Sequence, residues 1–366
     1  MAKEDDAGSP PPEIPSDDVK SHRIWIRYRT ELCHRFTGEV LRHVDSEEPG
    51  PVDIQRTDNE PIFELVTRYI ARDPNADLGR SKEQTRVPTQ AVGSTPSCFL
   101  RIYSPAIINA LQSVVEYYPG QDLSGTTIVI RWPYPILVHH YEKLCDFKTK
   151  CKTTDLNELC VRERDAAAHI DLLLHFLDDN IMEQARAEEE RIKRGYYTFE
   201  NFWVSHKPGR TIVFQDDSRK KEWVPLVISS IGGGIFENPP MPWTVFGWSL
   251  TFDGESLGRI SKTMLQERFD GERKWQENTI YLDGTDTING NDALEKLILD
   301  GERYWSLVKK QCKYHNGKTV EFPYNEIDGL VMVDLENYYE TYPDLRPLLV
   351  ADVDCKRWSS DCTCSV

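Results

Sequence analysis

The sequence predicts an α+β fold in two parts: an N-terminal, mainly helical part that ends in a long connector helix, then a compact antiparallel β domain with one packed helix. Two observations predict this fold. An apolar stripe at helical spacing begins near residue 155 and runs toward residue 195. From residue 196 to 345, short aromatic and β-branched segments alternate with Gly, Pro and Asp-Gly pairs, a pattern typical of a barrel or a sandwich.

The segments before residue 98 give weak signals. HRIWIRYRTELCHRF (22–36) fits a strand or a short helix, whereas PIFELVTRYI (61–70) has its apolar residues at the spacing of one helix face. The stretches 45–61 and 73–97 are polar and contain proline, so we interpret them as loops. A loosely organised region is therefore expected here.

Residues 104–119 carry the signals of a complete helix. Ser104 can cap its N-terminus, Pro105 suits the first helical position, and Pro119 stops it. TIVIRW (127–132) then predicts a strand, and ILVHHYEKLCDF (136–147) predicts a short helix.

The longest expected helix covers residues 155–195. Asp155 and Glu158 have capping-box spacing, and Gly195 closes the helix. Its apolar stripe contains Leu156, Leu159, Ala166, Ile170, Leu173, Leu174, Leu177 and Ile181. About 40 helical residues would span about 60 Å. We expect this helix to leave its own core and either kink or act as a connector.

Asp-Gly pairs recur through the second half of the chain. They occur at 253–254, 270–271, 283–284, 300–301 and 328–329. Both residue types tolerate positive φ, so an Asp-Gly pair between apolar runs predicts a tight turn. The pair at 300–301 is the exception, because ALEKLIL and ERYWSLVKK on either side have helical spacing.

These signals divide the chain into five regions. We expect a disordered acidic and proline-containing tail (1–20), the loosely organised segment (21–97) and an α/β part ending in the long helix (98–195). A β-rich domain (196–345) and a polar tail containing cysteine (346–366) follow.

Composition excludes several classes of partner. The net charge of −16 disfavours binding to nucleic acid or to anionic lipid. The sequence has no run of about 20 apolar residues, so no membrane span is expected. The first residues lack the pattern of a signal peptide, and the nine cysteines are an odd number. Reduced thiols and a cytoplasmic or nuclear location are therefore expected. The oligomeric state stays open.

The sequence offers no catalytic, cofactor-binding or metal-binding residue that we assign. Gly258 to Thr263 (GRISKT) comes nearest to a nucleotide-binding P-loop, but it lacks the glycine before Lys262 and fits a strand-to-turn segment better. The carboxylate pairs Asp253/Glu255 and Asp270/Glu272 lie on expected turns, where such residues are ordinarily solvated.

Two groups of cysteines are candidate zinc ligands. The first group is Cys355, Cys362 and Cys364; the second is Cys145, Cys151 and Cys160 beside His139 and His140. Neither group supplies two C-x-x-C pairs, so reduced thiols fit the first group better. His139 and His140 are interpreted as hydrogen-bonded structural residues.

Tryptophan is frequent in the expected β domain. The positions are Trp203, Trp223, Trp243, Trp248, Trp275 and Trp305. Most of these rings should fill the core. An exposed ring would instead mark a surface that binds a protein, because Trp and Tyr dominate interface energies.

The order of segments from about residue 98 to 345 resembles the uncharacterised domain that precedes the ATPase core in large fungal AAA-type ATPases. The segments are SPAIINALQSVVEYYP, TIVIRWPYPILVHHYEKL, the long helix, YYTFENFWVSHKPG, WSLTFDGESLG, LEKLILDGERYWSL and DGLVMVDLENYYETYPDLRPLL. Residues 269–287 are more polar than this family's strand pattern. The resemblance implies a P-loop core after the region, and the chain stops at Val366 without one.

The resulting hypothesis is a non-catalytic, intracellular module that binds a protein partner or recruits a substrate. One alternative is a fragment of a full AAA-type ATPase, with ATP bound and hydrolysed in a missing C-terminal core. A second alternative is an unrecognised small-molecule-binding or hydrolytic enzyme, which a charge-lined pocket with a perturbed His or carboxylate would favour.

Overall fold

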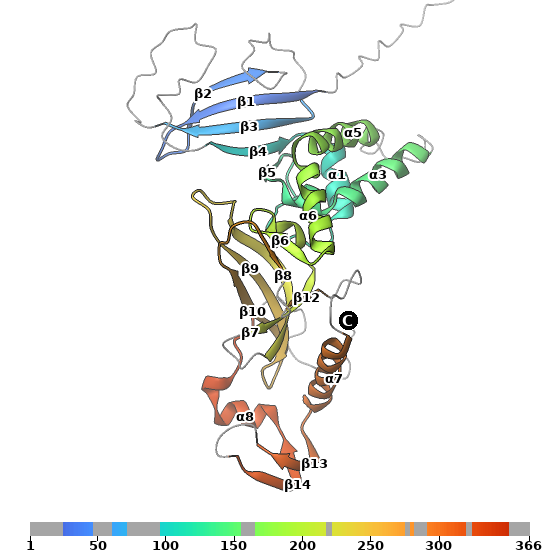
Figure 1. The fold of residues 1–366 in the computed structure, drawn as a ribbon, viewed down its shortest axis with the longest axis vertical. Coiled ribbons are helices and arrows are strands. Elements are labelled where there is room, and N and C mark those ends of the chain that lie inside the picture. The colour runs from blue at the N-terminus through green and yellow to red at the C-terminus, as the bar shows by residue number, and fades with distance from the viewer. Residues whose placement is uncertain are drawn as a thin grey trace, which may run out of the picture.

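A computed structural model describes residues 25–46, 61–71, 96–154, 165–216, 222–274, 279–281, 291–319 and 324–350. Its elements are arranged along the long axis of the molecule (Figure 1). One five-stranded sheet with a layer of helices lies at one end, a second five-stranded sheet follows, and a small C-terminal unit lies at the other end.

The first sheet has the strand order β2-β1-β3-β4-β5. Its strands are β1 (Ile26–Cys33), β2 (Val40–Ser46), β3 (Phe63–Ile70), β4 (Ser97–Ile102) and β5 (Ile128–Arg131). β1 and β3 run parallel, and the other neighbours are antiparallel. The sheet thus combines strands from both sides of residue 97.

Helices cover one face of this sheet (Figure 1). They are α1 (Pro105–Val114), α2 (Pro135–His139), α3 (Tyr141–Thr153), α5 (Ala166–Leu177), a π-helical turn η2 (Asp178–Met182) and α6 (Glu183–Lys193). Phe176 of α5 packs edge-on against Phe63 of β3, with 5.4 Å between ring centroids. The core built here continues without a break into the second sheet, where it includes Trp203 and Trp243.

The second sheet is antiparallel throughout, with the order β10-β9-β8-β7-β12. Its strands are β7 (Thr211–Asp216), β8 (Glu222–Gly234), β9 (Met241–Phe252), β10 (Leu257–Gln266) and β12 (Thr279–Tyr281). A short ladder of β6 (Tyr196–Thr198) with β11 (Glu272–Lys274) and a 3-10 turn η3 (Phe202–Ser205) connect this sheet to the helices.

The end of β8 depends on two glycines. Gly233 and Gly234 have φ of +78° and +52°, a conformation that side chains with a Cβ rarely adopt. A Cβ on Gly234 would lie 1.9 Å from the indole of Trp243, a residue that is 0% exposed. The glycines therefore let the chain turn tightly over this ring before it enters β9.

The C-terminal unit contains α7 (Asn291–Leu307), a hairpin of β13 (Gln311–Lys318) with β14 (Glu326–Val333), α8 (Leu335–Thr341) and a 3-10 turn η5 (Pro343–Leu345). It is anchored to the second sheet. The backbone N–H of Phe252 donates to the hydroxyl of Tyr304 at 3.2 Å, and Val350 forms a bridge with Arg259 of β10.

The predicted fold class is wrong. The described chain is mainly β-structure with short helices, and its N-terminal part is a sheet rather than a helical region. The described strands of 196–345 form an open five-stranded sheet and two-stranded ladders, neither a barrel nor a sandwich.

The long connector helix is also absent. Residues 155–164 lie outside the described part, and the helical residues after them are the three pieces α5, η2 and α6. α6 does not leave the core, because Glu188 is buried and accepts hydrogen bonds from the backbone N–H and the hydroxyl of Thr198.

Individual segments had mixed outcomes. α1 begins as predicted, since the hydroxyl of Ser104 accepts from the N–H of Ile107. Residues 61–70 form a strand instead of a helix. Asp300–Gly301 lies inside α7 as expected, whereas Asp328–Gly329 lies inside β14 and not at a turn. No helix among the described residues is long and apolar enough to cross a membrane.

Candidate functional site

The face of the first sheet opposite the helices carries alternating arginine and glutamate side chains. They come from alternate positions of β1, β3, β4 and β5, which strand register brings into neighbouring rows. This charged face consists of Arg27, Arg29, Glu31, Glu64, Arg68, Phe99, Arg101, Val129 and Arg131. Asp45 of β2 lies opposite Arg29 and binds it through two hydrogen bonds of 2.8 and 2.9 Å.

Two carboxylates lie beneath the arginines. Glu64 is 0% exposed; it accepts from the hydroxyl of Tyr103 at 2.8 Å and from the guanidinium of Arg101. Its other oxygen lies 3.5 Å from Arg27 and 3.7 Å from Arg29. A buried carboxylate is stable only when paired in this way.

The second carboxylate, Glu31, accepts two hydrogen bonds from Arg68, at 3.0 and 2.8 Å, and lies 3.5 Å from Arg101. The ring of Phe99 lies near the same two arginines, with their Cζ atoms 4.8 and 5.5 Å from its centroid. Arg68 and Arg101 are thus fixed from two sides, by a carboxylate and by an aromatic ring.

The Asp45 pair illustrates the electrostatics at the edge of this face. Burial alone would raise the pKa of the Asp45 carboxyl, but the hydrogen bonds and the charge of Arg29 outweigh burial and hold that pKa below its usual value. Burial raises the pKa of the Tyr103 phenol, so it stays protonated and donates to Glu64.

The connection between β8 and β9 stands opposite the charged face and encloses a groove of about 850 Å³. The arginine groove, as we call it, is lined from the first sheet by Arg68, Pro96, Ser97, Cys98, Phe99, Arg101, Val129, Arg131 and Trp132, and from the connection by Ile235, Phe236, Glu237, Asn238 and Pro240. Its volume lies at the upper end of the range for ligand pockets.

Two exposed residues at the end of β5 line this groove. Trp132 is 42% exposed. Arg131, also exposed, forms no ion pair with any residue that the structure describes. Both face the groove and are free to contact another molecule there.

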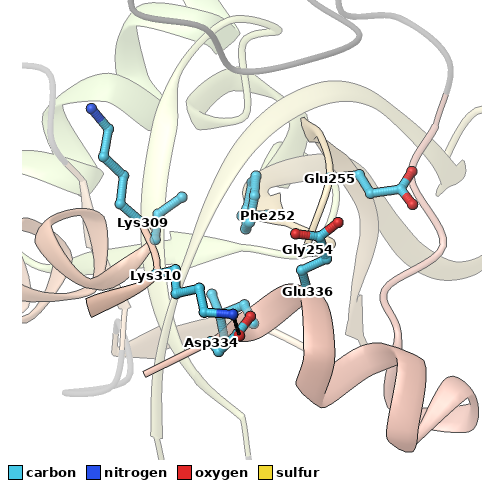
Figure 2. A pocket seen from close by; sticks show the side chains of 9 residues that line it. Phe252, Gly254, Glu255, Lys309, Lys310, Asp334 and Glu336 are labelled. Atoms are coloured by element: carbon cyan, nitrogen blue, oxygen red, sulfur yellow. Dashed lines mark ion pairs between the residues drawn. The ribbon is translucent and has the colours of Figure 1, made fainter. Parts of the chain in front are cut away.

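A second hollow, of about 440 Å³, lies where the C-terminal unit meets the second sheet. Figure 2 shows Lys310 beside Asp334, while Lys309 points away from them. Lys310 and Asp334 form an ion pair of 2.6 Å, and Asp334 also caps α8 by accepting from the N–H of Asn337. These charges hold the C-terminal unit together, so we place the candidate site at the arginine groove instead.

His139 and His140, the candidate metal ligands, are hydrogen-bonded, as interpreted from the sequence; His140 is buried and His139 is partly buried. Nε2 of His139 donates to the carbonyl of Trp203, and its Nδ1 accepts from Tyr118, both at 3.1 Å. Burial lowers the pKa of His139 to about 3 and that of His140 to about 4. Burial likewise lowers the pKa of His206 to about 3, so all three are neutral near pH 7.

The described residues contain no cluster of three His, Cys, Asp or Glu that could hold a metal ion. Of the described cysteines, Cys33, Cys98, Cys145 and Cys312 are free thiols. Cys160 and the trio Cys355, Cys362 and Cys364 lie outside the described residues.

The remaining sequence candidates are structural. Gly258 to Thr263 lies within β10, where Gly258 packs against Leu349. Asp253 does lie on a turn, but it is not simply solvated, because it accepts from the N–H of Ser256 at 2.7 Å and from Arg346 at 3.0 Å. Glu272 binds Arg191 at 2.7 Å.

Of the six tryptophans expected mostly in the core, two of the four whose side chains are described are buried. Trp203 and Trp243 are buried, Trp305 is 44% exposed, and Trp248 stacks under Arg259 at 4.1 Å. Trp275 and the side chain of Trp223 lie outside the part of the chain that the structure describes. The sequence reasoning missed Trp132 and the charged face. The alternation of Arg and Glu in RIWIRYRTE and in FELVTR was the signal that could have identified that face.

One family model matches part of the chain. Residues 187–280 match a domain of unknown function (DUF7025), and the match runs from within α6, through β6 to β11, to within β12. No curated protein and no solved structure matches the chain. One wall of the arginine groove, residues 235–240, lies inside the matched segment, and the arginine wall lies outside it. The likeness to the region before an AAA-type ATPase core stays a prediction.

Proposed function

We propose that this chain is a non-catalytic module that binds a segment of a protein partner in the arginine groove. The observation that carries the proposal is an exposed Trp132 beside arginines that are already held in place. Trp and Arg are the residue types that contribute most at protein interfaces, especially inside a pocket. The groove provides both on one wall and Phe236 on the other.

Preorganisation supports the proposal. Arg68 and Arg101 are anchored by Glu31 and by Glu64, so a partner would not have to order these long side chains. Immobilising a flexible side chain on binding costs roughly 0.5–1.5 kcal/mol. A fixed wall avoids most of that cost, and it presents the same geometry to every incoming segment.

A catalytic role for the groove has less support. Cys98 is its one thiol; it lies 3.9 Å from the hydroxyl of Thr67, and among described residues no base is hydrogen-bonded to it. The histidines with strongly lowered pKa values are His139 at the end of α2, His140 directly after it and His206 after η3, and none of them lines the groove. A binding surface fits this distribution better than an active site does.

The proposal is tested by selecting binders for the full chain from a display library of random short peptides. Selected peptides are synthesised, and their affinities are measured by fluorescence anisotropy for the native chain and for Trp132→Ala. Removing a central interface tryptophan should weaken binding by more than about tenfold.

Trp305→Ala is the matched control, since Trp305 is as exposed as Trp132 but belongs to α7. It should leave the affinities unchanged. The proposal fails if no selected peptide depends on Trp132, or if the peptides lose affinity on Trp305→Ala instead.

A further inference from the structure

We infer that the arginine groove selects a segment with one carboxylate flanked by apolar residues, and that Arg131 binds this carboxylate. The inference rests on the proposed function and specifies its ligand. It follows from how the charges of the groove are already paired.

The first step concerns the arginines. Arg68 and Arg101 line the groove, but their guanidinium groups already bind the carboxylates of Glu31 and Glu64. Arg131 lies opposite Phe99 in the strand register and pairs with no described carboxylate. The groove therefore has one cation available to a ligand, and a guanidinium binds a carboxylate in a planar, bidentate manner.

The second step excludes more highly charged ligands. A phosphate carries about two negative charges near pH 7 and is bound best by several available cations. Here Glu237 lies on the opposite wall, and Glu31 and Glu64 lie beneath the arginines. The chain also has a net charge of −16, which repels a strongly acidic segment at long range. One carboxylate matches the groove; a phosphate or a run of acids does not.

The third step concerns the neighbours of Arg131. Val129, two residues earlier on the same face of β5, is 45% exposed, and Trp132 follows directly with 42% of its surface exposed. Phe236 and Ile235 face them from the β8–β9 connection. An acidic side chain that reaches Arg131 would thus be flanked by apolar contacts on both sides, and those contacts favour apolar neighbours in the ligand.

The test uses the peptides selected on the native chain. Each is resynthesised with its acidic residue replaced by the matching amide, or by phosphoserine, and is measured against the native chain, Arg131→Gln and Arg303→Gln. Arg303 is an exposed arginine of α7, remote from the groove, and serves as the control. The amide peptide should bind about tenfold more weakly to the native chain. Arg131→Gln should abolish that difference, and Arg303→Gln should retain it.

Three outcomes overturn the inference. If acid and amide peptides bind the native chain equally, the groove does not recognise a carboxylate. If the preference for the acid peptide survives Arg131→Gln, Arg131 is not the residue that binds the carboxylate. Phosphoserine peptides binding about tenfold more tightly than the acid peptides would show a site for a dianion. In each case a loss of affinity on Trp132→Ala would leave the proposed function standing, so the two failures are distinguishable.

Discussion

Replacing Gly234 by alanine should destabilise the second sheet and displace one wall of the arginine groove. Gly234 has φ of +52°, and the left-handed conformation costs a residue with a Cβ roughly 1–2 kcal/mol. The new methyl group would also lie 1.9 and 2.1 Å from two carbons of the Trp243 indole. Trp243 has little room to move, because its Nε1 donates to the carbonyl of Phe199 at 2.6 Å and its ring packs against Phe236.

Overpacking of this kind costs about 1–3 kcal/mol, so the expected total is roughly 2–5 kcal/mol. Gly232→Ala is the matched control. The nearest atom to a Cβ at Gly232 is a ring carbon of Phe246 at 3.6 Å, an ordinary contact, and its φ is not positive. Urea unfolding followed by far-UV circular dichroism would compare the two variants. Groove affinities measured without denaturant should fall for Gly234→Ala alone, because the connection that it displaces includes Phe236.

A second variant isolates the clash. In a Trp243→Phe background the smaller ring leaves space for the methyl group, so Gly234→Ala should cost less there, by about 1 kcal/mol or more. Equal stability of Gly232→Ala and Gly234→Ala, or strict additivity of Gly234→Ala with Trp243→Phe, would refute the reasoning.

Three further perturbations test the rest of the structure. His139 and His206 have pKa values of about 3 in the folded chain and about 6.5 unfolded, so the unfolded state binds more protons below pH 6.5. Their contribution is complete above pH 6.5 and falls with pH; at about pH 5 the loss is about 2 kcal/mol each, and the melting temperature should drop by roughly 5 °C. An unchanged melting temperature would contradict their burial as neutral groups. Glu64→Gln removes the buried negative charge that Arg27, Arg29 and Arg101 surround and should cost about 3–5 kcal/mol in chemical denaturation; a cost under about 1 kcal/mol would count against the charged face as a paired network. Ser104→Ala removes the cap of α1 and should cost about 1 kcal/mol, whereas Ser113→Ala in the same helix should be nearly neutral; equal losses would argue against the cap.

Features set by neighbouring residues were predictable from the sequence. The cap at Ser104 and the first position at Pro105 define α1 locally, and the β-branched run before Trp132 defines β5. The Asp253–Gly254 turn also forms as expected, because the carboxylate of Asp253 accepts from the N–H groups of the next residues. In each case the interactions lie within a few positions along the chain.

Features set by distant partners were not predictable in this way. Residues 61–70 have apolar side chains at helical spacing, yet they become β3 because β1 and β4 pair with them on both sides. Glu64 within this segment looks solvated in the sequence, but Arg101, 37 positions later, makes its burial tolerable. Glu188 of α6 is buried for the same reason, since Thr198 and Arg191 satisfy its carboxylate. The candidate site depends on such partners throughout.

The width of the arginine groove depends on contacts that connect the two sheets away from the groove itself. Lys207 donates to the carbonyl of His139 at 3.0 Å, and the ring of His139 is hydrogen-bonded to the backbone of Trp203. On the outer side, Trp248 of β9 donates to the hydroxyl of Tyr117 at 3.1 Å. These bonds join the helical layer of the first sheet to the second sheet, so the β8–β9 connection is held at a fixed distance from the charged face. Residues of the first sheet and of the β8–β9 connection line the groove, so the affinity of a bound partner segment depends on how the two sheets are arranged.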